Sequence, residues 1–185
     1  MLIAGAGCSV GTDPAGGPGT ESWERAKQSF DRGQYAEVVP ELEHAALPGS
    51  PFQEAATVWR LVLLGGLTRG YLTLAGSHAE REGGEAGASA DRYFAEADEA
   101  AARYAKALGD YQQLGGAGPV ILAFGFPKGP LTPPGLGAAE DAVLAHAVIQ
   151  ETAALAGYPG DPGRALREFK PREVSVPRKQ FEAAI

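Results

Sequence analysis

Three histidines are the side chains in this sequence best suited to proton transfer or metal binding, and they are widely separated. His44, His78 and His146 each stand alone, and none belongs to a motif that pairs a nucleophile with a base. The sequence patterns of the nucleophile elbow, the zinc protease helix, the phosphate loop and the calcium loop are also absent. The sequence therefore predicts no catalytic residues and no cofactor.

Carboxylates are the next candidates for chemistry. Glu140 and Asp141 precede His146 by six and five residues, so the three side chains do not share one face of a helix and a common metal ion is not expected. A second set of acidic residues is accompanied by arginines at the i, i+4 spacing of a solvated helix face. The acidic residues are Glu96, Asp98 and Glu99, and the arginines are Arg92 and Arg103. The sequence therefore predicts no metal site.

The composition limits the class of protein and its partners. The chain has 185 residues, of which 44% are hydrophobic, enough for one compact core. Sixteen basic and 23 acidic residues give a net charge of −7, which disfavours nucleic acid as a partner. With Cys8 as the single cysteine, no intrachain disulfide can form. The best apolar stretch, residues 59–75, is interrupted by Arg60 and Arg69, so we expect no membrane-spanning segment.

Two short helices are predicted at the start of the globular part. Apolar residues recur at helical spacing from Thr20 to about Arg32 and again from Tyr35 to Ala46. Gly33 lies between these segments, where a left-handed residue would end the first helix. Pro48 follows the second segment and stops it. Two helices joined by a tight glycine turn form an αα-hairpin.

This hairpin resembles a tetratricopeptide repeat (TPR), a family of stacked helical hairpins. The residues that carry the resemblance are Ala26, Phe30, Gly33, Tyr35, Glu37, Leu42 and Ala45. The small alanines would let the helices approach each other, and the glycine would supply the turn. Val38 departs from the pattern, because the family prefers a small residue there. The resemblance implies a surface that binds a peptide or a partner protein.

A second, longer hairpin is predicted downstream. One stripe of apolar residues runs from Phe52 to Leu74, and another runs from Ala90 to Tyr111. The sequence around Phe94 echoes that around Tyr35, but 59 positions later, whereas TPR units repeat about every 34 residues. We therefore predict an all-α fold in which two TPR-like αα-hairpins and additional C-terminal helices form a superhelix or a bundle.

The distal third combines an apolar segment with an irregular one. Residues 120–126 are strongly apolar and lie within the Gly115–Gly137 loop, whose glycines and prolines prevent regular structure further on. The segment could form a helical turn or a short extended piece, and it could be buried under the hairpins or exposed to a partner. Helices are expected at 138–156 and 162–169, the latter capped by Asp161.

The N-terminal residues resemble the processed end of a bacterial lipoprotein. A short run of small apolar residues ends in Cys8, and a glycine- and proline-rich stretch follows it. The resemblance implies that Cys8 is lipidated. Seven residues before the cysteine are fewer than a signal peptide has, and Gly5 replaces the usual aliphatic residue; a non-functional N-terminus is the alternative. We expect residues 1–19 to be a signal remnant and tether, 20–169 the helical domain, and 170–185 a mobile or draped tail.

Two functions follow as hypotheses. The first is a non-catalytic protein-binding or scaffolding module, held at the bacterial cell envelope by lipidated Cys8 and cytoplasmic if that cysteine is unmodified. The alternative is a small-ligand-binding lipoprotein that assists solute uptake through an apolar pocket. The candidate pocket residues are Trp59, Tyr71, Tyr104, Phe124 and Phe126. An open groove on the first hairpin would favour the protein-binding hypothesis, and an enclosed pocket between the second hairpin and the apolar segment would favour the alternative.

Overall fold

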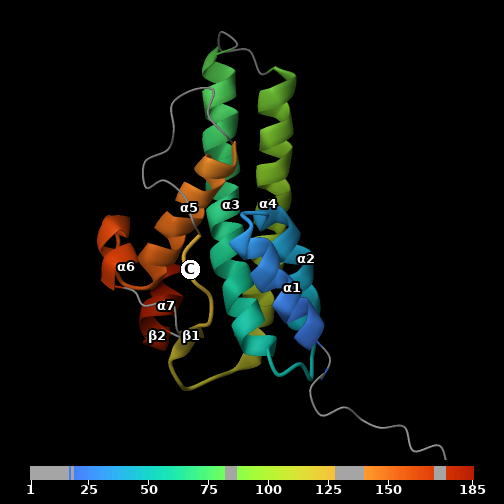
Figure 1. Ribbon diagram of the computed structural model, residues 1–185, viewed down its shortest axis with the longest axis vertical. Helices are drawn as coiled ribbons and strands as arrows, with labels where there is room; N and C mark the ends of the chain where they lie inside the picture. Colours follow the sequence, from blue (N-terminus) through green and yellow to red (C-terminus); the bar gives the residue numbers. More distant parts are fainter. Residues whose placement is uncertain (1–16, 18, 82–86, 128–139, 169–173) are drawn as a thin grey trace, which may run out of the picture.

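The computed structural model describes residues 17, 19–81, 87–127, 140–168 and 174–185, and within them the fold is all-α (Figure 1). Cys8 and residues 128–137 of the glycine-rich loop lie outside the described residues. The helices are α1 (Thr20–Asp31), α2 (Tyr35–Ala45), α3 (Gln53–Arg81), α4 (Ala88–Leu114), α5 (Glu140–Leu155), α6 (Pro162–Glu168) and α7 (Arg178–Ala184). The strands are β1 (Val120–Leu122) and β2 (Val174–Val176). None of the helices described is both long enough and apolar enough to cross a membrane.

The two helices predicted for the first hairpin are observed as α1 and α2, which pack against each other. Gly33 adopts the left-handed conformation expected of it, with φ of 79°, and so reverses the chain between the helices. Ala26 and Ala45 are completely buried, which is consistent with close approach of the helices. At the turn, the Phe30 and Tyr35 rings meet edge to face with their centroids 5.5 Å apart.

The second hairpin, formed by α3 and α4, is the centre of the molecule. Figure 1 shows these two long helices side by side, with α1 and α2 against one side of the pair, α5 against another, and α6 on the far side of α5. Trp59 of α3 is 1% exposed and joins the two sides. Its ring makes edge contacts with Trp23 and Phe30 of α1 and stacks on Phe124 at a centroid distance of 5.2 Å.

Glycines on α3 allow unusually close packing against α5. A Cβ atom on Gly66 would lie 2.7 Å from the Cα of Val148, and one on Gly70 would lie 3.3 Å from the Cα of Leu144. No side chain fits there unless the backbones separate. These glycines, together with Gly65, interrupt the apolar stretch in the sequence, but in the structure they form the face of α3 on which α5 packs.

The apolar segment and residues 174–185 of the tail, which we expected to be mobile or draped, pack together. β1 pairs antiparallel with β2, with Val120 opposite Val176, and both side chains are buried. Of the two conformations left open for residues 120–126, the first three residues adopt the extended one. Phe181 of α7 is fully buried, with its ring 5.4 Å from that of Tyr111. The last residues are ordered because these apolar side chains have a surface to cover.

Candidate functional site

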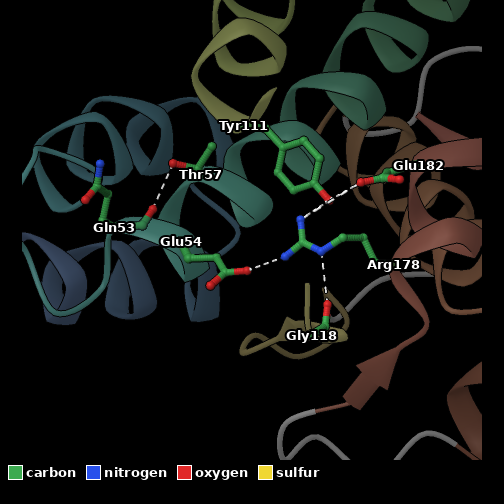
Figure 2. Close-up of polar contacts among 7 residues, drawn as sticks. All are labelled: Gln53, Glu54, Thr57, Tyr111, Gly118, Arg178 and Glu182. Carbon is green, nitrogen blue, oxygen red and sulfur yellow. Dashed lines mark hydrogen bonds and ion pairs between the residues drawn. The ribbon is translucent and has the colours of Figure 1, made fainter. Parts of the chain in front are cut away.

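Two polar clusters stand out in the structure, and the first surrounds Arg178 at the start of α7 (Figure 2). The guanidinium donates to the Gly118 carbonyl at 3.0 Å, to the Tyr111 hydroxyl at 2.9 Å and to the Glu54 carboxylate at 2.9 Å. The Tyr111 hydroxyl in turn donates to Glu182 at 3.4 Å. We call these five residues the Arg178 cluster. Its groups form hydrogen bonds and ion pairs with one another, and they join α7 to α3, to α4 and to the residues just before β1. The cluster therefore stabilises the fold.

The second polar cluster surrounds an open cavity of about 370 Å³, which we call the turn pocket. It lies where the turn at Gly33 meets α3, α4 and the beginning of α5. Its lining consists of residues 33–37, Tyr71 and Leu74 of α3, Arg92, Tyr93 and Glu96 of α4, and Glu140, Asp141 and Leu144 of α5. Four separate segments of the chain therefore contribute to one cavity.

Three tyrosines form the aromatic part of the turn pocket. Tyr35 and Tyr93 are each 3% exposed, and the rings of Tyr71 and Tyr93 stack with centroids 6.4 Å apart. The Tyr93 hydroxyl accepts a hydrogen bond from Arg92. By contrast, the hydroxyls of Tyr35 and Tyr71 have no hydrogen-bond partner among the residues that the structure describes. A hydroxyl that lines a cavity and has no partner among the described residues is available to a ligand.

The charges around the turn pocket are also unbalanced. Arg92 lies 3.4 Å from the Glu140 carboxylate and 4.5 Å from the centroid of the Tyr93 ring. The other three carboxylates of the lining have no ion-pair partner in the described part of the chain. They belong to Glu37 on α2, Glu96 on α4 and Asp141 on α5. The turn pocket therefore carries an excess of negative charge.

This negative charge affects the tyrosines. Burial raises the pKa of Tyr35, and the charge on Asp141 raises it further. Burial likewise raises the pKa of Tyr71, with a further contribution from Glu96. The pKa of Tyr93 is raised by burial first and by its contact with Glu140 second. The three hydroxyls thus remain neutral at physiological pH and can accept or donate a hydrogen bond.

The five aromatic residues predicted to bind a ligand do not meet in one cavity. Trp59 and Phe124 stack on each other in the core, and Phe126 packs against that core while partly exposed. The Tyr104 hydroxyl donates to the Ile185 carbonyl at 3.2 Å, at the other end of the long hairpin. Of the five, Tyr71 alone is part of the turn pocket.

Sequence reasoning missed Tyr35 and Tyr93 as site residues, because their spacing also fits a packed helix face. A local signal exists for Tyr93, since Glu96 follows it by three residues and shares its helix face. Glu37 follows Tyr35 by two residues, a spacing that places the two side chains on different faces. The contribution of Asp141 could not be found in this way, because it comes from a helix far along the chain.

The described histidines and acidic residues are dispersed over the fold. The histidines lie on three different helices, α2, α3 and α5. Within the parts of the chain described, no group of three or more histidine, cysteine or acidic side chains is placed to hold a metal ion. Comparison of the chain with protein families, with curated proteins and with solved structures finds no match.

Proposed function

We propose that this protein is a non-catalytic protein-binding or scaffolding module whose turn pocket receives a side chain from a partner. The observation that carries the proposal is the open cavity at the turn of the first hairpin, lined by polar groups without partners in the described structure. Such groups are accessible and held on helices, as a recognition site requires. The resemblance of this hairpin to a TPR unit supports the same function.

Binding of a free small molecule is the second candidate. A volume of about 370 Å³ falls within the range of small-molecule sites. The aromatic residues first expected to form an apolar ligand pocket mostly have other roles, since Trp59 and Phe124 fill the core by stacking. If the protein binds a small molecule, the geometry therefore favours a polar solute in the turn pocket.

Attachment to the bacterial cell envelope through lipidated Cys8 is a further part of the proposal, supported by the sequence resemblance alone. It predicts that a fatty-acid analogue labels the protein in a bacterial host when a functional secretion signal precedes the segment. Cys8→Ser is expected to abolish the label. A wild-type chain that takes up no label under these conditions would contradict the proposed attachment.

Selection of peptides from a displayed random library tests the binding function. Ala36 is exposed at the mouth of the turn pocket, so Ala36→Trp should obstruct the cavity without disturbing the core. We expect peptides selected on the wild type to bind this variant at least about tenfold more weakly in fluorescence anisotropy. Ala102→Trp, at an exposed position on α4 away from the pocket, is the matched control and should bind normally. Equal binding to both variants would exclude the turn pocket as the binding surface.

A further inference from the structure

The turn pocket also indicates what kind of group the partner presents. Resting on the proposed function, we infer that the pocket binds an alkylammonium group, supplied either by a lysine side chain of a partner or by a free amine. If the pocket binds a peptide through a side chain other than lysine, the alkylammonium inference is wrong while the proposed binding function still holds.

Charge is the first argument. Three carboxylates on three helices, those of Glu37, Glu96 and Asp141, surround the cavity without a cation in the described structure to neutralise them. A cation entering the pocket would lower this mutual repulsion. An anion would increase it, and a neutral group would leave it unchanged.

The structure already contains one cation bound in this way. Arg92 places its guanidinium over the Tyr93 ring, 4.5 Å from the centroid, with the Glu140 carboxylate 3.4 Å from one of its nitrogens. A cation paired with both an aromatic face and a carboxylate is a favourable arrangement. The remaining part of the pocket offers the same two kinds of group, in Tyr71 and the three unpaired carboxylates, without a cation.

The hydroxyl of Tyr35 is the second, independent observation. Its side chain is 97% buried, being 3% exposed, it lines the cavity, and its oxygen has no hydrogen-bond partner in the described part of the protein. An ammonium carries three donors and no acceptor, so it can donate to this oxygen while its charge is attracted by the carboxylates of the lining. The tyrosine oxygen thereby gains the partner that the described residues do not supply.

The apolar lining distinguishes an alkylammonium from a metal ion. Leu74 and Leu144 are 6% and 8% exposed and line the same cavity, where they can contact the methylene groups of an amine. Within the described residues, no three acidic, histidine or cysteine side chains are close enough together to coordinate a metal. A long apolar stem ending in a compact charge fits both features.

Titration with two defined probes, followed by nuclear magnetic resonance of the backbone amides near Gly33, tests the inference. The probes are the blocked peptide acetyl-Gly-Lys-Gly-amide and the diamine cadaverine, and the control peptide contains acetyl-lysine in place of lysine. We expect at least one amine probe to bind in the turn pocket, and the acetyl-lysine peptide to bind at least about tenfold more weakly. Binding of the peptide alone identifies a protein source, and binding of cadaverine alone identifies a free amine.

Variants make the test specific. Glu96→Gln and Asp141→Asn should each weaken amine binding by about three- to tenfold, and higher salt should weaken it as well. Asp98→Asn removes the same charge from an exposed position on α4 outside the pocket and should have no such effect. Tyr35→Phe should weaken binding several-fold while the protein stays equally stable. Equal binding of the lysine and acetyl-lysine peptides, or no binding of either amine probe, would overturn the inference.

Discussion

The Arg178 cluster and the turn pocket are built from the same kinds of side chain, but they differ in how many of those groups have partners. Arg178 donates to a tyrosine, a carboxylate and a carbonyl, and Tyr111 bonds both Arg178 and Glu182. In the turn pocket, Tyr35 and three carboxylates have no such partners within the described residues. Both clusters join elements that are distant in sequence.

The difference indicates where each cluster acts. Polar groups that satisfy one another hold elements together, and they gain little from an added ligand. Polar groups that remain without partners next to an open cavity add little to stability, but they can bind a molecule from outside. On this basis the Arg178 cluster has a role in folding, and the turn pocket has a role in recognition.

The largest effect on stability is expected for Arg178→Ala. The change removes three hydrogen bonds from a side chain that is 15% exposed, and it leaves the Tyr111 hydroxyl without its donor. We expect the free energy of unfolding to fall by about 2–3 kcal/mol, as measured by urea denaturation. Lys179→Ala, at the exposed next position on α7, should change it by less than about 0.5 kcal/mol. Equal effects of the two substitutions would refute a stabilising role for the cluster.

A matched pair of tyrosine substitutions sharpens the comparison. Tyr111→Phe removes a hydroxyl with two partners and should lower the free energy of unfolding by about 1 kcal/mol. Tyr35→Phe removes a hydroxyl that has none in the described structure, so the change should stay within about 0.5 kcal/mol. Thermal and urea denaturation of both variants measure the difference. A larger loss for Tyr35→Phe would show that its hydroxyl does stabilise the fold.

A change of opposite sign is expected at Glu151, a carboxylate on α5 that lies between these two extremes. Among the described residues its ion-pair partner is Arg69 at 2.8 Å, but burial raises the pKa of Glu151 above the ordinary value by more than Arg69 lowers it. The folded protein therefore binds the proton more readily than the unfolded chain, so protonation of Glu151 stabilises the fold as the pH falls. Glu151→Gln should raise stability at pH 7 by up to about 1 kcal/mol, and this gain should shrink towards pH 5.

Urea denaturation of the wild type and of Glu151→Gln at both pH values checks this prediction. A variant that is less stable than the wild type at pH 7 would show that the ion pair with Arg69 outweighs the cost of burial. The result therefore shows whether the ion pair with Arg69 offsets the free-energy cost of burying the Glu151 charge.

The local parts of the fold could be predicted from the sequence, because their signals are local. The turn at Gly33, the two hairpins and the cap at Asp161, whose carboxylate accepts from the Arg164 amide at 2.8 Å, all follow from spacing and residue type. The pairing of β1 with β2 could not be predicted, because each strand is only three residues long. Such short strands carry too little periodicity to identify a distant partner.

The turn pocket was beyond sequence reasoning for a related reason. The sequence predicts a packed helix face from the spacing of the tyrosines. The cavity itself forms only when α5 brings Asp141 next to the first hairpin. That placement depends on Gly66 and Gly70, whose missing side chains let α5 approach α3. In the sequence the same glycines are only interruptions of an apolar stretch.

The contact between Arg178 and Glu54 joins residues 124 positions apart, and this has a consequence for the order of assembly. The two hairpins depend on neighbours in the chain and can form quickly, whereas closing so long a loop has a large entropic cost. During synthesis β2 and α7 also leave the ribosome after these four helices. We therefore expect α1 to α4 to associate first, and the nascent protein to expose the β1 edge and the Tyr111 ring until β2 and α7 have been synthesised.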